Sequence, residues 1–234
     1  MSFGDKNFTY GPRIVKDGLV FYVDAANPKS YVSGDTTCND LIQSNNGTLI
    51  NGPTFDTNNG GSIVFDGSDD SVSISSMVSY SSDDPHTYSA WVNAVNTTSY
   101  KWILNNGGST NGTSLIIYGG YMGFFWRGGG AVRQGIIPIN INTWYNLTVS
   151  YNGSDGTYDM YVNGILDTSS NTSSATAGSG VSWVAGTSVP IIGSWYNGSF
   201  DYNGKVSNVK IYNRALSSTE ILQNYNALKP RFGL

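Results

Sequence analysis

The sequence predicts an all-β protein in which two antiparallel sheets pack as a sandwich, with one short helix near the C-terminus. Three observations predict this class. Clusters of Gly, Asn, Ser and Thr interrupt the chain about every 8–12 residues. The runs between these clusters alternate between apolar and polar residues, and a helical period is found only near the end of the chain. About a dozen strands follow from this spacing, which is typical of a two-sheet sandwich.

The strands are predicted by a period of two, the pattern of a sheet with one face buried and the other wet. Ile63 and Phe65 fall on one face of the first clear run, and Val72 and Ile74 fall on one face of the next. Three further runs show the same alternation, with apolar residues at Tyr88, Ala90 and Val92, at Leu147, Val149 and Tyr151, and at Met160 and Val162.

Glycine-containing turns predict which of these strands form hairpins. Gly119-Gly120 separates two runs, and two glycines supply the positive φ angles that a two-residue hairpin loop requires. Asn163-Gly164 is the pair preferred in a type I′ turn. The segment 152–156, Asn-Gly-Ser-Asp-Gly, predicts a longer turn between two strands.

The one predicted helix begins at Ser217. Ser217 and Glu220 have the spacing of a capping box, in which each side chain bonds the backbone of the other residue. Ile221, Leu222 and Tyr225 then form one apolar stripe, and Pro230 is predicted to end the helix. The helix is expected to lie against the sandwich.

The chain is predicted to form one domain over residues 19–228. Residues 1–18 are assigned to an N-terminal arm outside the core and residues 229–234 to a C-terminal tail. No signal segment is expected at the N-terminus, which lacks an apolar stretch, and no apolar run approaches the roughly 20 residues that span a bilayer.

Composition excludes several classes of protein. A single cysteine, Cys38, rules out an internal disulfide or a Cys-based zinc site, and a single histidine, His86, rules out a His-rich metal centre. The 12 basic residues are scattered and the net charge is −4, so nucleic acid is not an expected partner. Membrane insertion is not expected either.

Four segments, at residues 61–70, 88–92, 144–164 and 204–217, resemble in their order and spacing the laminin-G-like, concanavalin A-like lectin/glucanase superfamily. The resemblance covers roughly residues 18–228. It implies a jelly-roll sandwich of two curved antiparallel sheets.

A narrower similarity lies in residues 11–31 and 46–55, which resemble stand-alone laminin-G-like proteins of tailed, especially marine, bacteriophages. This resemblance implies a component of the virion surface: a capsid decoration, tail or fibre protein whose partners are other virion proteins. The chain departs from the common form at Cys38, where Trp or Tyr is usual. It departs again at Ser207-Asn208, where acidic residues are frequent, and this weakens any calcium site carried over to that strand.

Catalysis is not expected. Glucanases of the superfamily carry a strand with two Glu residues, and this chain contains one Glu, Glu220. Asp83 and Asp84 are adjacent, so they would point to opposite faces of a strand, and His86 is predicted to lie in a turn. An unusual glycan hydrolase or lyase that uses Asp83 and Asp84 is the remaining enzymatic alternative.

One acidic segment is a candidate calcium site. Asp66, Asp69 and Asp70 place three carboxylates within five residues, and hard cations prefer such oxygen clusters. A hairpin turn whose Asp side chains cap backbone amides explains the same residues. Asp201 is a second candidate source of ligands.

Aromatic residues with polar neighbours are the candidate carbohydrate-binding residues, because sugars stack their C–H faces on flat rings. The alternative is packing in the core or at a subunit interface, which is favoured for Trp91, Phe125 and Trp144. The candidates are Tyr121, Trp126, Trp183, Trp195, Tyr196 and Asn197.

The sequence therefore predicts a non-enzymatic virion-surface protein whose lectin-like sandwich attaches to host-surface polysaccharide. Decoration without ligand binding is a structural variant of the same hypothesis. A free carbohydrate-binding module is the second hypothesis. Association between copies is expected, because the edge strands of an open sandwich need to be covered.

Overall fold

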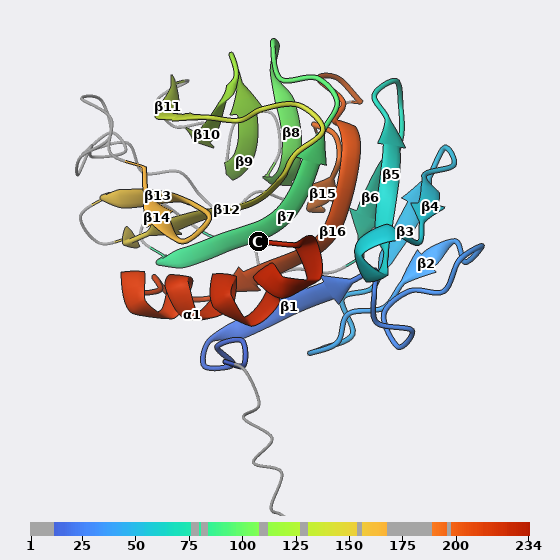
Figure 1. Ribbon diagram of the computed structural model, residues 1–234, viewed down its shortest axis with the longest axis horizontal. Coiled ribbons are helices and arrows are strands. Elements are labelled where there is room, and N and C mark those ends of the chain that lie inside the picture. Colours follow the sequence, from blue (N-terminus) through green and yellow to red (C-terminus); the bar gives the residue numbers. More distant parts are fainter. Residues whose placement is uncertain are drawn as a thin grey trace, which may run out of the picture.

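The computed structural model is shown in Figure 1. The residues it describes are 12–75, 80, 84–107, 112–126, 131–153, 156–167, 189–195 and 198–234, with the backbone alone described at 126 and 131.

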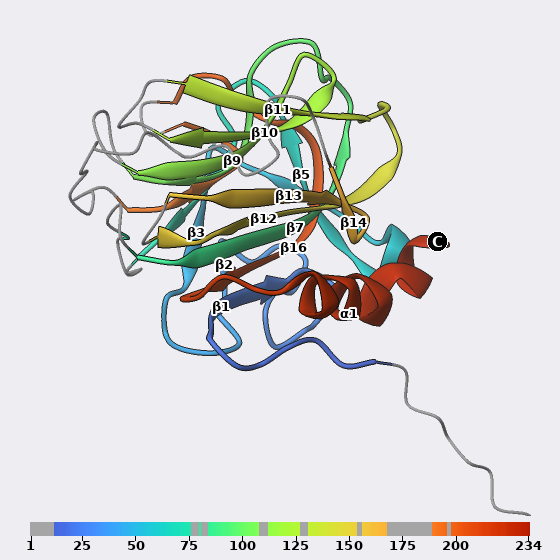
Figure 2. The same cartoon turned by 90° about the vertical axis from the view of Figure 1, so that its left-hand side faces the viewer.

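Two eight-stranded antiparallel sheets pack face to face, and we call them sheet A and sheet B (Figures 1 and 2). Sheet A has the order β14–β13–β12–β7–β16–β5–β4, and β1 pairs with β16 beyond the segment that pairs with β5. Its strands are β1 (Leu19–Asp24), β4 (Thr54–Asp56), β5 (Ser62–Asp66), β7 (His86–Ala94), β12 (Trp144–Tyr151), β13 (Tyr158–Val162), β14 (Ile165–Leu166) and β16 (Asn203–Tyr212).

Sheet B has the order β11–β10–β9–β8–β15–β6–β3–β2. Its strands are β2 (Thr37–Cys38), β3 (Gly47–Ile50), β6 (Ser71–Ile74), β8 (Lys101–Asn106), β9 (Thr113–Tyr118), β10 (Tyr121–Trp126), β11 (Ala131–Pro138) and β15 (Ile191–Ile192). The predicted two-sheet sandwich is confirmed.

The core between the sheets contains the apolar faces that the alternation predicts. Ile63 and Phe65 of β5 and Val72 and Ile74 of β6 are buried there. The predicted hairpins also form: Gly119 and Gly120 join β9 to β10 with φ angles of 59° and 86°. Asn163 and Gly164 join β13 to β14 with φ angles of 54° and 75°.

The outer face of β7 is buried as well, which its alternation did not predict. Trp91 on this face is completely buried, and its ring stacks on Phe232 with 4.0 Å between centroids and on Tyr225 with 5.7 Å. Helix α1 (Ser218–Leu228) and the following 3-10 helix η4 (Lys229–Phe232) cover this side of sheet A (Figure 2). None of the described helices has the length and hydropathy needed to cross a membrane.

The capping box of α1 is confirmed. The Ser217 hydroxyl accepts a hydrogen bond from the Glu220 amide at 3.4 Å, and the Glu220 carboxylate accepts one from the Ser217 amide at 2.9 Å. The predicted apolar stripe is wrong at Leu222, which is 44% exposed. The buried residues of α1 are Ile221 and Asn224, because a polar contact, not an apolar one, anchors its second turn.

Both predicted terminal segments contact the sandwich where they are described. The Val15 amide donates to Asn224 Oδ1 at 2.8 Å, and its carbonyl accepts from the Tyr212 hydroxyl at 3.0 Å. In η4, Pro230 lies at the start of a further helical turn and Phe232 is buried. The domain boundaries at residues 19 and 228 stay predictions.

A short 3-10 helix, η1 (Asn58–Gly60), connects β4 to β5 and lies against η4. Trp144 at the start of β12 completes this contact, since its indole N–H donates to Asn59 Oδ1 at 3.1 Å and its ring lies 4.7 Å from that of Phe232. The expected packing role of Trp91 and Trp144 is therefore found on the outer face of sheet A.

Candidate functional site

The outer face of sheet B carries a cluster of aromatic rings. Six residues form this aromatic cluster: Tyr100 and Trp102 at β8, Tyr118 at the end of β9, Phe125 on β10, and Trp195 and Phe200 in the loop from β15 to β16. No described helix covers this face, because α1 and η4 lie on the opposite side of the molecule (Figure 2).

Trp102 lies at the centre of the aromatic cluster. Its ring centroid is 5.4 Å from that of Trp195, 5.7 Å from that of Phe125 and 5.3 Å from that of Phe200. Tyr100 extends the cluster by stacking on Tyr118 with 4.1 Å between centroids. Trp102 is only 3% exposed, whereas Phe200 is 43% exposed, so the cluster has a rigid centre and an accessible rim.

Strand alternation places these rings outward. On β10 the side chain of Phe124 is in the core, so that of Phe125 points to the outer face. Gly123, between Tyr121 and Phe125, has no side chain, and a Cβ there would lie 2.8 Å from Cγ1 of Ile116. The glycine therefore leaves room for the buried side chain of its cross-strand partner, Ile116.

The loop after β15 is held to the sheet by backbone hydrogen bonds. The Trp102 amide donates to the Phe200 carbonyl at 3.2 Å, and the Trp195 amide donates to the Ser199 carbonyl at 3.2 Å. Phe200 has a φ of 60°, a left-handed conformation that is unusual for a bulky residue. Such conformations persist where the surroundings impose them, and here the result is an exposed ring beside Trp102.

Two buried polar atoms at the cluster have no hydrogen-bond partner among the described residues. They are Nε1 of Trp102 and Oδ1 of Asp201, the residue next to Phe200. The Asp201 side chain is buried, while its carbonyl accepts a hydrogen bond from Lys101 Nζ at 3.0 Å. A buried polar atom without a partner is unusual, and these two lie beneath the accessible rim of the cluster.

The candidate calcium residues Asp66, Asp69 and Asp70 lie together in the turn between β5 and β6. Each offers an oxygen atom, and the three oxygens lie within 4.8 Å of one another. Calcium binds oxygen at about 2.3–2.6 Å, so ligands on opposite sides of one ion are about 5 Å apart. The spacing fits a hard cation.

The same residues also perform the turn role. Asp66 Oδ1 accepts from the Ser68 amide at 2.8 Å, and Asp70 Oδ2 accepts from the Asp66 amide at 2.9 Å. Burial, together with the carboxylates of Asp66, Asp69 and Asp201, raises the pKa of Asp70. Asp201 follows Phe200 and lies two residues before Asn203, which pairs with Asp66, so only a short stretch of chain separates the acidic turn from the aromatic cluster.

Ser207 and Asn208 do not extend this acidic site. The Ser207 hydroxyl donates to the Gly61 carbonyl at 2.7 Å, and Asn208 Oδ1 accepts from Lys210 Nζ at 2.7 Å. The Ser207 hydroxyl also accepts a hydrogen bond from Arg231, so both side chains have structural partners.

Of the candidate carbohydrate-binding residues, Trp195 lies in the aromatic cluster. Tyr121 is half-buried and pairs with Tyr118, which places it on the same face of sheet B. Trp126 ends β10, and its side chain is outside the described part of the structure. Trp183, Tyr196 and Asn197 also lie outside the described residues.

Sequence reasoning missed Tyr100, Trp102, Tyr118 and Phe200, and it favoured packing in the core or at a subunit interface for Phe125. The structure places the half-buried Phe125 ring on the outer face and not in the core, 5.7 Å from the ring of Trp102, and the subunit-interface alternative stays a prediction. A signal was present for Trp102 and Phe125. Each adjoins an apolar residue of the core, Ile103 and Phe124 respectively, and neighbouring side chains on a strand point to opposite faces. Phe200 had no such signal because it lies in a loop.

The side chains considered for catalysis have structural partners. Arg214 Nη2 donates to Glu220 Oε1 at 2.6 Å, and this hydrogen bond with the capping box lowers the pKa of Glu220 to about 2. His86 was predicted in a turn, but it is the first residue of β7 and is completely buried, because its ring packs among three tyrosines. Asp84 is exposed, and Asp83 lies outside the described residues.

A profile of the laminin-G type, described as the concanavalin A-like lectin/glucanases superfamily, matches residues 66–222. The chain belongs to this superfamily. The match includes the acidic turn and all six residues of the aromatic cluster. A search of curated protein sequences found no match.

Solved structures with a similar fold include both enzymes and binding domains. Trypanosoma rangeli sialidase in complex with sialic acid has a TM-score of 0.67 and 14% identity over 95% of this chain and 36% of the sialidase. The chain thus spans about a third of the sialidase's length. Domain 4 of the GH43 extracellular arabinanase AbnA from Geobacillus stearothermophilus, in complex with arabinotriose, has a TM-score of 0.65 and 16% identity over 90% of this chain and all of that domain.

The binding domain of Paraclostridial mosquitocidal protein 1 is a third similar structure, with a TM-score of 0.66 and 18% identity over 90% of this chain and 52% of that one. At these identities the likeness establishes the fold alone. Function has to be argued from the residues at the site.

Proposed function

We propose that the protein is a carbohydrate-binding domain without catalytic activity, and that it binds a glycan on the aromatic cluster. The observation that carries this proposal is the exposed rim around Trp102, with Phe200 43% exposed and Trp195 and Phe125 half-buried beside it. Flat rings offer stacking surfaces to the C–H faces of sugars, and adjacent polar atoms bind their hydroxyl groups.

The polar groups beside the rings support the same proposal. The Trp102 indole N–H and Asp201 Oδ1 have no partner among the described residues, so a sugar hydroxyl that reached them on binding would satisfy one donor and one acceptor. The likeness in fold to an arabinanase domain solved with arabinotriose is a supporting analogy.

The side chains that could act as acid or base already have structural roles, which supports binding and not catalysis as the function. Retaining and inverting glycosidases need two carboxyl groups flanking one bond. Glu220, the single Glu of the chain, is held by Arg214 and Ser217. His86 is buried away from solvent. Release of reducing sugar from bacterial or algal polysaccharide would contradict this part of the proposal.

Binding to an array of bacterial glycans tests the proposal. We expect Trp195→Ala and Phe200→Asn each to weaken binding at least about tenfold, because truncating a central ring of a binding surface typically costs more than about 1.4 kcal/mol. Asn tolerates the left-handed backbone of residue 200, so Phe200→Asn removes the ring with little strain. Ile141→Asn is the matched control, since Ile141 is 52% exposed and lies outside the aromatic cluster.

The same array, measured with calcium and again with EDTA, tests the acidic turn. Loss of binding in EDTA would show that binding needs a divalent cation, and among the described residues Asp66, Asp69 and Asp70 are grouped to hold one. Unchanged binding would leave these residues as turn residues. If the wild type binds no glycan, or if both ring variants bind as well as Ile141→Asn, the proposal is wrong.

We further propose that this binding takes place on the surface of a tailed-phage virion, where the domain attaches to host polysaccharide. The similarity of residues 11–31 and 46–55 to phage proteins supports this setting, and association between copies is part of it. Co-sedimentation of the protein with purified virions is the expected result, and deletion of residues 1–18 is expected to abolish it. Protein that stays in the supernatant would favour a free carbohydrate-binding module.

A further inference from the structure

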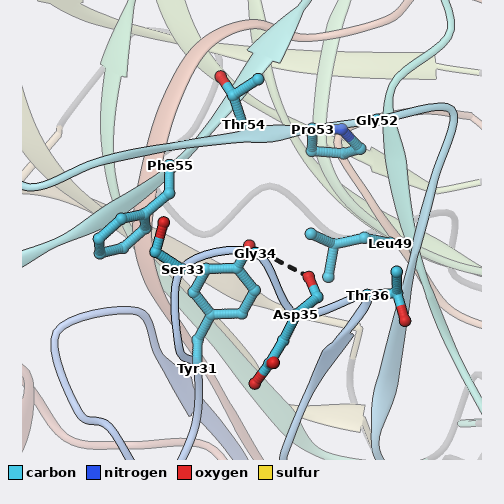
Figure 3. Close-up of a pocket in the computed structure, with 10 residues that line it drawn as sticks. All are labelled: Tyr31, Ser33, Gly34, Asp35, Thr36, Leu49, Gly52, Pro53, Thr54 and Phe55. Atoms are coloured by element: carbon cyan, nitrogen blue, oxygen red, sulfur yellow. Dashed lines mark hydrogen bonds between the residues drawn. The ribbon is translucent and has the colours of Figure 1, made fainter.

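A pocket of about 410 Å³ lies at the edge of the sandwich where the terminal strands of the two sheets, β2 and β4, come together. The loop 31–36 forms one wall and the end of β3 with the start of β4 forms the other (Figure 3). None of the pocket's residues belongs to the aromatic cluster.

The two edges of the sandwich differ in how they are closed. At the opposite edge, Asp167 after β14 accepts hydrogen bonds from the Ile136 and Ile137 amides of β11 at 2.7 and 3.1 Å, which joins the two sheets. At the β2–β4 edge the rings of Tyr31 and Phe55 meet, with 5.4 Å between centroids and an angle of 46° between their planes.

Two glycines leave the space beside these rings open. Gly34 and Gly52 have φ angles of 94° and 100°, which bend the two walls, and a Cβ at either position would have no atom within 4 Å. The loops therefore turn sharply without a side chain at either bend. The result is a pocket large enough for a small ligand.

The lining has the composition that a sugar ring requires. Phe55 and Leu49, which are half-buried, supply apolar surface, and Ser33 and Thr36 supply hydroxyl groups. Tyr31, which is 4% exposed, and Pro53 lie buried beneath them. Figure 3 shows the Tyr31 ring between Phe55 and Leu49, with its hydroxyl directed into the pocket. That hydroxyl donates to the Asp35 carbonyl at 3.3 Å and can accept a second hydrogen bond.

The charged residues of the pocket favour a neutral sugar over an anionic or a cationic one. The lining contains no Lys, Arg or His, and its one ionisable acidic residue is Asp35. An anionic sugar would therefore find no cation in the pocket and one like charge beside it. The Asp35 carboxylate points away from the space between the rings, so an amino sugar gains no ion pair there (Figure 3).

We infer that this pocket is a second carbohydrate site, which takes a single neutral sugar unit. The inference is independent of the aromatic cluster, because the two sites share no residue. A glycan-binding protein with two separate sites gains avidity when both engage one polysaccharide.

Titration of the ¹⁵N-labelled protein with glucose, galactose, arabinose, glucosamine and glucuronate, followed by NMR, tests the inference. We expect a neutral sugar to shift the Gly34 and Gly52 amide signals in a saturable way. Ser33→Trp, which fills the pocket from an exposed position, is expected to abolish these shifts. Ser44→Trp is the matched control, because Ser44 is exposed and does not line the pocket.

Thr54→Trp fills the pocket from its other wall and serves if Ser33→Trp fails to fold. The inference is overturned if no neutral sugar shifts the two glycine signals, or if folded pocket-filling variants bind as the wild type does. Tighter binding of glucuronate or glucosamine would overturn the neutral class. Shifts that disappear in Phe200→Asn but persist in Ser33→Trp would move the sugar to the aromatic cluster, which separates a failure here from a failure of the proposed function.

Discussion

Replacing Arg231 with alanine is expected to lower the free energy of unfolding by about 3 kcal/mol, because removing one partner of a buried ion pair strands the other. Arg231 Nη1 donates to Asp24 Oδ1 at 2.7 Å, and the two side chains are only 16% and 9% exposed. The guanidinium also donates to the carbonyls of Asn59 and Gly61, at 2.6 and 2.9 Å, and to the Ser207 hydroxyl.

The expected loss is at the lower end of the usual range of roughly 3–5 kcal/mol for such pairs, because Asp24 keeps a second cation nearby. Lys210 is completely buried, and its burial lowers its pKa to about 7 while the Asp24 carboxylate acts in the opposite direction. Without Arg231, the ammonium of Lys210 is left to balance the Asp24 charge.

Urea unfolding at neutral pH measures this effect. Lys29→Ala is the control, because Lys29 is exposed and its replacement also removes one positive charge. Arg231→Lys is expected to give an intermediate loss, because an ammonium lacks the guanidinium's fork of donors. Equal unfolding midpoints for Arg231→Ala and Lys29→Ala would contradict the expected contribution of the Arg231 ion pair.

Acidification is expected to destabilise the protein through its single histidine. Burial lowers the pKa of His86 to about 4, from an ordinary value of 6.5. The unfolded chain therefore binds a proton between pH 6.5 and 4 that the folded protein does not bind. The stability is fully present above pH 6.5 and is lost as the pH falls toward 4, by about 3 kcal/mol in total.

Burial is the main reason that the His86 ring resists a second proton, and the hydrogen bond at its second nitrogen adds to it. Its Nδ1 lies 2.9 Å from the Asp84 carbonyl, which can only accept, so Nδ1 carries the proton. Its Nε2, 3.0 Å from Thr113 Oγ1, must then accept from that hydroxyl. Thr113 in turn accepts from the Tyr88 hydroxyl, which accepts from Asn106. A proton on Nε2 would require the Thr113 hydroxyl to reverse and donate to Tyr88, whose own hydrogen would then lose its acceptor.

Proton NMR checks this directly, since a chain with one histidine gives one set of imidazole signals. We expect these signals not to titrate until the pH approaches 4. His86→Phe keeps a ring among Tyr80, Tyr88 and Tyr151 but removes the titration, so its stability should fall about 3 kcal/mol less than that of the wild type between pH 7 and 4. An imidazole that titrates near pH 6.5 would contradict the expectation.

Features that depend on neighbouring residues were predictable. The alternation around Ile63 and Phe65 gave the inward face of β5, and Asn163-Gly164 gave the turn between β13 and β14. The capping box at Ser217 and Glu220 gave the start of α1. Each of these is a property of a few consecutive residues, and the local backbone preference agrees with the final fold.

The sequence did not predict whether another segment covers the outer face of a strand or helix. Alternation in β7 distinguishes two faces, but it does not tell that Trp91 is covered by Phe232, a residue from the far end of the chain. Leu222 was placed on the buried stripe of α1, whereas Asn224 occupies that position because it bonds Val15 and Tyr212. The partner of a face decides whether it is buried, and that partner is remote in sequence.

The candidate site divides in the same way. The sequence by itself determined the superfamily, the two-sheet sandwich, the acidic turn at Asp66–Asp70 and the single Glu that argues against glucanase chemistry. Only the tertiary structure decided that Trp102 is the centre of the aromatic cluster and that Tyr31 and Phe55 border a pocket. Both sites join segments far apart in the chain, because antiparallel pairing and the crossovers between sheets bring together side chains that no local pattern relates.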